Sequence, residues 1–278
     1  MPDKIRTDTD TIGIVGGTGY YTMEMEEHEQ LHGETPFGTF TASSGIVGGK
    51  RVIFIARHGL RHKFLPHEVN YRANVYALKK LGVRQVFSFC MAGMLSKKYE
   101  IGDIVIPDQF IDLTHGRSNT FFGEGNSVYV SMADPFCPEL SSFAARELNG
   151  SGIKAHFGGT YVCIQGPHFS TRAESRFYSS FGDVIGMTAA TEAKLAREAG
   201  LCYTVLASVV DQDTCSMGMK DVKHTIESVK CIAGKLVQSA SVHTFCRCAG
   251  SMKGSVINRT GQLDHVIGKP STRSMFND

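Results

Sequence analysis

The chain has 278 residues, of which 42% are hydrophobic, enough to bury the core of one large domain. Its net charge of +2 provides no broad basic surface, which argues against nucleic acid or a membrane surface as a partner. No apolar run approaches the roughly 20 residues of a membrane helix, and the polar start MPDKIRTDTD does not resemble a secretory signal. We therefore expect a cytoplasmic protein that binds a small molecule.

Apolar runs taken in chain order predict six strands, at residues 12–15, 51–56, 84–89, 103–111, 159–164 and 202–210. Amphipathic patterns predict helices at 69–81, 191–199 and 219–245, and Thr191 is suited to cap the second of them. Buried strands that alternate with amphipathic helices indicate a single α/β domain with a mixed, largely parallel central sheet flanked by helices. We assign residues 1–247 to this domain, and the Gly-, Ser-, Lys- and Arg-rich residues 248–278 to a flexible tail.

The eight cysteines form no C-x-x-C pair, and most of them lie in apolar stretches such as FSFCMAG. Reduced, packed thiols are therefore expected in preference to disulfides or a metal site.

Polar clusters follow the ends of several predicted strands, where ligands of α/β folds bind. GGTG, with Thr18, follows the first strand and suits an anion, although a plain strand-to-helix turn explains it as well. Arg57 and His58 follow the second and are typical phosphate donors, or else form a surface ion pair. For His62 and His67, in the loop that follows, a structural or interface role is as plausible as catalysis.

Two later clusters have an equally plausible structural explanation. In QGPHFSTRAES, Phe169 is placed to stack on a planar ring, while Ser170 or Thr171 is suited to cap a helix. In IGMTAATEA, Met187 offers an apolar surface and Thr188 a hydroxyl at a helix entrance, or else the two are a core methionine and an ordinary cap.

Asp211 and Asp213 follow the last strand in SVVDQDTC. Residues two apart in a strand share a face, so both carboxylates are expected to meet one ligand. The alternative is a pair of loop acids that cap backbone N–H groups.

The order of these motifs is more specific than any one of them. GGTG, ARHG-x-x-H, VNYRAN, GDIVIPDQFID, QGP-x-F-S-T-RAE, GMT-x-x-x-EA-x-LARE and D-x-D succeed one another between residue 12 and about residue 240. In this order the chain resembles the methylthioadenosine phosphorylase branch of the trimeric purine nucleoside phosphorylase family.

The resemblance implies that a purine nucleoside is cleaved by inorganic phosphate, giving the free base and a pentose 1-phosphate, with no metal or organic cofactor. It implies phosphate at Thr18, Arg57, His58, Thr188 and the strand-end position Cys90. Substrate is implied at Met91, Ala92 and Gly93, with the ribose against Met187 and the purine against Phe169. A homotrimer is implied as well, in which the site borrows a residue from a neighbour, for which His115 and Phe121 are the candidates.

The departing purine needs a proton at N7, and we assign Asp211 as the donor and Asp213 as its partner at the exocyclic amine. Burial and a second carboxyl both raise the pKa of such an acid. Two acceptors also favour a 6-amino purine over a 6-oxo purine, so adenine-type nucleosides are expected. Among these, the resemblance implies 5′-methylthioadenosine as the substrate.

Two positions depart from the family pattern. Cys90 stands where the family usually has a threonine or asparagine, which predicts weaker phosphate binding. Val222 and Thr225 are expected to line the pocket for the 5′ substituent, where a threonine weakens the preference for a thioether. A broader adenosine or purine nucleoside phosphorylase, a hydrolase that does without phosphate, and a non-catalytic nucleoside-binding relative are therefore the alternatives.

Overall fold

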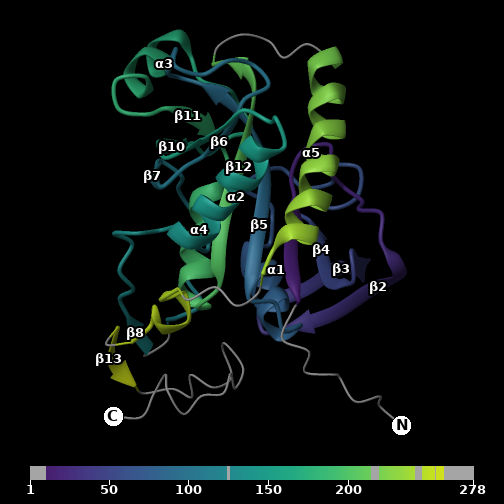
Figure 1. The fold of residues 1–278 in the computed structure, drawn as a ribbon. Coiled ribbons are helices and arrows are strands. Elements are labelled where there is room, and N and C mark those ends of the chain that lie inside the picture. The colour runs from purple at the N-terminus through teal and green to yellow at the C-terminus, as the bar shows by residue number, and fades with distance from the viewer. Residues whose placement is uncertain (1–10, 124–125, 214–218, 242–245, 254, 260–278) are drawn as a thin grey trace.

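A mixed sheet of eleven strands forms the centre of the described chain (Figure 1). The computed structural model describes residues 11–123, 126–213, 219–241, 246–253 and 255–259. Neighbouring strands follow the order β2 (Glu26–Thr35), β3 (Gly38–Val47), β4 (Lys50–Ala56), β1 (Ile12–Gly16), β5 (Gln85–Met94), β11 (Val184–Gly186), β10 (Thr160–Cys163) and β7 (Gln109–Asp112). On its other edge β5 pairs with β12 (Cys202–Gln212), which continues to β6 (Ile104–Ile106) and β9 (Ala155–Phe157).

Helices cover both faces of this sheet. On one face α1 (Tyr71–Lys80) and α4 (Ala189–Glu198) pack against inward residues such as Val15 and Ile53. On the other, α2 (Pro138–Gly150) and α5 (Met219–Ser239) cover alternate residues of the same strands, such as Ile14 and Phe54. Because strand neighbours point to opposite faces, strands that are apolar throughout belong between two helix layers. The predicted α/β architecture is confirmed.

Several predicted boundaries move. The run 103–111 is two strands, β6 and β7, because Pro107 has no N–H for a ladder and the chain turns there into another part of the sheet. The second predicted helix begins at Ala189, so Thr191 lies inside it and is not its cap. A short helix, α3 (Arg172–Tyr178), is capped by Thr171, whose side chain forms a capping box with Glu174.

The hairpin β2–β3 was not predicted, since its first strand, EEHEQLHGET, is mostly exposed and carries no apolar alternation.

The segment after α5 is not simply a tail. Cys248 begins a short 3₁₀ helix (Cys248–Gly250), and both Cys248 and Met252 are buried. Further on, β13 (Val256–Arg259) pairs with β8 (Asn126–Val128) in a small second sheet (Figure 1). Apolar side chains at 248 and 252 thus hold part of the predicted tail against the domain, whereas residues 260–278 lie outside the described residues.

Strand β5 changes its pairing partner along one edge, and this change leaves an opening in the sheet close to the predicted site residues. On one edge it pairs in parallel with β1 as far as Ser88, and from Gly93 it pairs instead with the antiparallel strand β11. No strand of the described chain pairs with residues 89–92 on that edge. The backbone between these two partners is therefore available to a ligand.

Within the described residues, no helix is both long and apolar enough to cross a membrane.

Candidate active site

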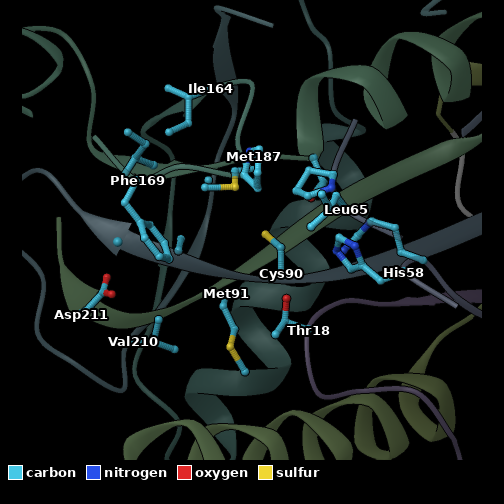
Figure 2. Close-up of a pocket in the computed structure, with 18 of the residues that line it drawn as sticks. Thr18, His58, Leu65, Cys90, Met91, Ile164, Phe169, Met187, Val210 and Asp211 are labelled. Carbon is cyan, nitrogen blue, oxygen red and sulfur yellow. The ribbon is translucent and has the colours of Figure 1, made fainter. Parts of the chain in front are cut away.

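A pocket of about 280 Å³ lies over this opening in the sheet (Figure 2). Twelve predicted site residues line it: Thr18, Arg57, His58, Cys90, Met91, Ala92, Gly93, Phe169, Met187, Thr188, Asp211 and Asp213. His58 lies toward one end of the pocket, and Phe169 and Asp211 lie toward the other (Figure 2). The structure thus brings the predicted anion-binding residues and the predicted acids to opposite ends of one cavity.

Arg57 is buried and forms an ion pair with Glu192. Its Nε donates to Glu192 Oε1 at 2.5 Å, and its Nη2 donates to Glu192 Oε2 and to the hydroxyl of Ser88. Its Nη1 donates to the carbonyl oxygen of Phe89 at 3.0 Å. Four of the five guanidinium N–H groups are used in this way, which leaves one on Nη1. The alternative of a surface ion pair is wrong, because this pair is buried, and an incoming anion can take only that one N–H.

Glu192 is the second half of this network. It also accepts hydrogen bonds from Ser88 and from Tyr203, both at 2.7 Å. Burial alone would raise the pKa of Glu192, but Arg57 and these hydroxyls hold it below its ordinary value. Glu192 therefore remains charged, and the pair it forms with Arg57 is fully hydrogen-bonded.

His58 is oriented by its own loop. Its Nδ1 lies 2.8 Å from the carbonyl oxygen of Phe64, so Nδ1 carries the proton and Nε2 is left with a lone pair. Burial, and then the positive charge of Arg57, lower the pKa of His58 to about 4. The ring stacks on His62 at a centroid distance of 4.3 Å. The neutral ring accepts a hydrogen bond at Nε2, which differs from the donor role that the sequence suggested.

Two threonines offer hydroxyl groups to the same end of the pocket. Thr188 occupies the cap position of α4, but its side chain makes no cap hydrogen bond. Its buried hydroxyl is therefore free of the structural role that was the alternative, at a helix end that favours anions. Thr18 lies in the turn after β1, where Gly17 is required, because a Cβ there would lie 2.5 Å from the Phe89 carbonyl oxygen.

Cys90 lies on β5 between these groups and the acids (Figure 2). Burial raises the pKa of its thiol to about 11, so the side chain is neutral. It is only a weak hydrogen-bond donor there.

The acidic pair sits where β12 is irregular. Val209 pairs with Ala92 and Asp211 pairs with Gly93, so Val210 is an extra residue in the strand. The irregularity precedes both acids, so it leaves their two-residue spacing intact, and both line the pocket as predicted. Gly93 makes room for them, since a Cβ there would lie 3.0 Å from Asp211 Oδ1.

The two carboxyl groups have different environments. Burial, and then the charge of Asp213, raise the pKa of Asp211 to about 6. Asp213 is more deeply buried, and its Oδ2 has no hydrogen-bond partner among the described residues. One acid thus keeps its proton up to about pH 6, well above the ordinary range of a carboxyl group, and the other has an acceptor atom available to a ligand. Backbone capping was the alternative for this pair, and the described chain gives no such contact to Asp213 Oδ2.

The apolar walls come from other segments. Phe169 is 69% exposed and borders the pocket, so its ring face is available to a planar ligand. Met187 is fixed through its backbone, because Arg117 donates to its carbonyl oxygen at 2.7 Å and to that of Gln165 at 2.6 Å. Arg117 is thus a positioning residue for this wall.

The last helix reaches the site through a different residue from the one expected. Thr225 lines a separate cavity with Ser208 and Ile104, and its predicted place in the pocket is wrong. Its neighbour Ile226 instead lines a small cavity shared with Thr18 and Met91. Adjacent residues of an α-helix point about 100° apart, so a shift of one position selects another face. The side chain of Val222 lies outside the described residues.

Several site residues were missed by the sequence analysis. Glu192 and Ser88 act through Arg57. Glu192 is the glutamate of the motif GMT-x-x-x-EA, but that motif gave it no role, and nothing in the local sequence marks Ser88. Leu65 and Pro66 line the pocket from the loop after β4 and were not considered. His62 of the same loop, for which catalysis and a structural role were both left open, lines the pocket too, and Arg61 and His62 have positive φ values of 60° and 58°. Of the two candidates for a borrowed residue, Phe121 is buried against its own Phe37, and His115 is exposed.

Comparison with known proteins agrees with this geometry. The family model described as "Phosphorylase superfamily" matches residues 11–241. The chain is 43% identical to an S-methyl-5′-thioadenosine phosphorylase of Geobacter sulfurreducens, covering 92% of this chain and 98% of that protein. It is also 43% identical to the enzyme of that name from Pyrococcus abyssi, with coverages of 87% and 97%.

Solved structures give the same result. A methylthioadenosine phosphorylase from an antarctic soil metagenomic library superposes with a TM-score of 0.85 at 35% identity, covering 95% of this chain and 96% of that one. Methylthioadenosine phosphorylase from Schistosoma mansoni in its apo form gives a TM-score of 0.78 at 33% identity, with coverages of 82% and 90%. The fold is that of a nucleoside phosphorylase-like α/β protein. This chain belongs to the phosphorylase superfamily, and within it the relatives named here are S-methyl-5′-thioadenosine phosphorylases.

Replacing Glu192 with glutamine tests the buried ion pair. Glu192→Gln keeps the shape of the side chain but leaves the charge of Arg57 uncompensated in the core, so we expect the free energy of unfolding to fall by about 3 kcal/mol. Denaturant unfolding measures the change, with Glu227→Gln, an exposed residue of α5, as the matched control. Equal stability of the two variants would contradict the importance given to this pair.

Proposed function

We propose that this protein catalyses the phosphorolysis of 5′-methylthioadenosine to adenine and 5-methylthioribose 1-phosphate, a reaction of purine salvage. The observation that supports it most directly is the pair of unlike carboxyl groups beside an exposed aromatic ring. Asp211, with its pKa raised to about 6, has a proton to give, and Asp213 has a free acceptor oxygen for an amino group. Phe169 provides a stacking surface next to them.

The assigned roles follow the charges of the reaction. As the bond between the sugar and the purine breaks, the sugar becomes cation-like and the base takes up negative charge. Asp211 gives its proton to N7, and Asp213 accepts a hydrogen bond from the exocyclic amine. The phosphate is held by the remaining N–H of Arg57, the hydroxyls of Thr18 and Thr188, and Nε2 of His58. No metal or organic cofactor takes part, since phosphate is the co-substrate.

His58 adds a condition to phosphate binding. Its neutral Nε2 accepts a hydrogen bond, and a phosphate that still carries one proton has an O–H to donate. A fully neutral acceptor at this position therefore favours a protonated phosphate.

The 5′ substituent is expected to lie near the small cavity of Ile226, Met91 and Thr18. With Thr225 turned to another cavity, the reason for expecting a polar 5′ pocket is removed. Ile226 and Met91 are apolar, which favours a thioether over a hydroxyl. Methylthioadenosine is accordingly the preferred substrate over adenosine.

A homotrimeric assembly in the cytoplasm is part of this proposal. The exposed apolar side chain of Leu113 and the exposed His115 lie on the loop that follows β7, on the described surface. Such residues suit an interface between subunits. Analytical ultracentrifugation gives the assembly directly, and a monomer at micromolar concentration would contradict it.

Product analysis tests the function. With methylthioadenosine and phosphate, adenine and methylthioribose 1-phosphate should form in equal amounts, and omission of phosphate should stop the reaction. Free methylthioribose without phosphate would indicate a hydrolase. Binding without adenine release would indicate a nucleoside-binding protein. A higher kcat/KM for adenosine or inosine than for methylthioadenosine would indicate a broader phosphorylase.

Asp211→Asn removes the proposed proton donor. We expect kcat for adenine release to fall by about 100-fold or more, which is the usual contribution of general acid catalysis. Steady-state kinetics gives this ratio, and retained adenine binding by calorimetry controls for folding. Near-normal turnover in Asp211→Asn would remove this residue from the mechanism.

The raised pKa of Asp211 predicts the pH profile. Above about pH 6 the free enzyme loses the proton that it must donate, so kcat/KM should fall about tenfold per pH unit there. Asp213→Asn removes the charge that is the second cause of the raised pKa, so the descending limb should move to lower pH even if the rate is low throughout. A limb at the same pH in both proteins would contradict the coupling of the two acids.

Cys90→Thr restores a hydroxyl donor next to the proposed phosphate position. A hydrogen bond to a charged group contributes about 1.5 to 3 kcal/mol, so we expect KM for phosphate to fall by at least about tenfold. The KM for methylthioadenosine should change little, and Cys163→Ser, a buried cysteine that does not line the pocket, is the control. An unchanged phosphate KM would show that Cys90 does not limit anion binding.

A further inference from the structure

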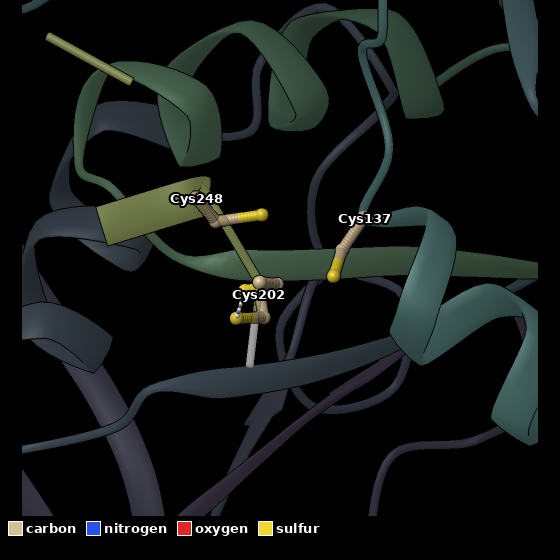
Figure 3. A group of neighbouring side chains, drawn as sticks. Cys137, Cys202 and Cys248 are labelled. Carbon is tan, nitrogen blue, oxygen red and sulfur yellow. Dashed lines mark hydrogen bonds between the residues drawn. The ribbon is translucent and has the colours of Figure 1, made fainter. Parts of the chain in front are cut away.

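Four of the cysteines, Cys137, Cys202, Cys246 and Cys248, meet near the start of β12. Figure 3 shows this group, with Cys137, Cys202 and Cys248 labelled. Cys137 precedes α2, Cys202 begins β12, and Cys246 and Cys248 belong to the segment after α5. Strand β12 runs from Cys202 to the acidic pair, so its eleven residues, about 35 Å of extended chain, separate the two places. No step of the proposed reaction uses these cysteines.

The four sulfur atoms lie within 4.8 Å of one another. A zinc ion bound tetrahedrally by four thiolates at about 2.3 Å would hold them about 3.8 Å apart. The Sγ atoms of Cys202 and Cys246 are 3.0 Å apart, so changes of about 1 Å or less give that arrangement. Two disulfides would require only two close pairs, whereas here each sulfur is close to the other three.

The backbone already fixes most of these positions. The N–H of Cys137 donates to the carbonyl oxygen of Tyr203, and that of Cys202 donates to the carbonyl oxygen of Arg84. Cys248 is held by its 3₁₀ turn and is buried, while Cys246 is partly exposed and leaves a route from solvent. Little chain entropy remains to be lost when an ion binds.

One carboxylate lies beside the cluster. The Cys137 thiol makes a weak contact with Glu139, at 3.6 Å, but Glu139 is exposed and can turn into solvent.

We propose that Cys137, Cys202, Cys246 and Cys248 bind a structural zinc ion. The ion fastens the segment after α5 to the start of β12 and to the entry of α2, and up to 111 residues of the chain (248 − 137 = 111) separate these ligands. The sequence analysis expected packed thiols in preference to a metal site. Only Cys246 and Cys248 are close together in the sequence, and the other two proposed ligands are distant from them. The proposal is independent of the proposed function.

Metal and thiol analysis of the full chain, prepared under nitrogen and without a metal-affinity tag, tests it. We expect about one zinc per chain by plasma mass spectrometry, and all eight cysteines to react with a thiol reagent in denaturant with chelator and no reductant. Replacement of zinc by Co²⁺ should give the strong visible absorption of a tetrahedral thiolate site. Cys248→Ser should lose at least about 90% of the zinc, and Cys231→Ser, an exposed cysteine outside the cluster, should keep it.

Chelation of the wild-type protein supplies a measurement that needs no variant. Removal of zinc should lower Tm by about 5 °C or more, and added Zn²⁺ alone should restore it. A chain without zinc that takes up no Co²⁺ would overturn the proposal, and so would the absence of four reactive thiols, which would indicate disulfides. Neither outcome bears on adenine release.

Discussion

The pocket depends on the buried ion pair between Arg57 and Glu192. Two charges taken out of water cost several kcal/mol each unless their hydrogen bonds are complete, and here Ser88 and Tyr203 complete them. The network joins the residue after β4 to β5, α4 and β12, and it lies directly beneath the pocket. Arg57 lies close to Gly17, where a Cβ would come within 2.9 Å of Nη1, and Glu192 belongs to the first turn of α4.

The other constraint is the change of partners along β5. Because β1 leaves β5 after Ser88 and β11 joins it at Gly93, the sheet has an opening without losing a strand. The irregularity of β12 lies beside the upper end of that opening, where Val210 is the extra residue and Asp211 stands opposite Gly93. Bulges of this kind redirect side chains near functional sites. Asp211 is thus directed by the sheet itself, and Asp213 follows in the turn after the strand.

The sequence was most informative where burial is complete. The strands that became β1, β4, β5 and β12 are apolar throughout because helices cover both of their faces, and this pattern is visible without the structure. The hairpin β2–β3 escaped prediction because its exposed face is filled with charged residues. Motifs at the strand ends likewise indicated most of the pocket, since parallel strands bring their carboxyl ends together.

Other features could not be read from local sequence. Glu192 is an ordinary helix residue until the fold places it against Arg57, 135 positions earlier. Whether Thr225 or Ile226 faces the site depends on how α5 is rotated about its axis. An apolar stripe in the sequence does not define that rotation to within one residue. The cysteine cluster joins three distant segments, and long-range proximity of this kind has no signature in spacing.

The charges of the pocket suggest how it favours bond cleavage over tight binding. Before the reaction, Arg57 is neutralised by Glu192, while His58 and Cys90 are uncharged, so an anion meets little net positive charge. In the proposed reaction the sugar becomes positive next to the phosphate, and the attraction between the two appears only as the bond breaks. Asp211 behaves in the same way, because a neutral acid interacts more strongly with the base once that base gains negative charge. Interactions that strengthen only in the transition state raise kcat. An arginine without a carboxylate partner would instead attract phosphate equally before the reaction and in the transition state, which tightens phosphate binding without raising kcat.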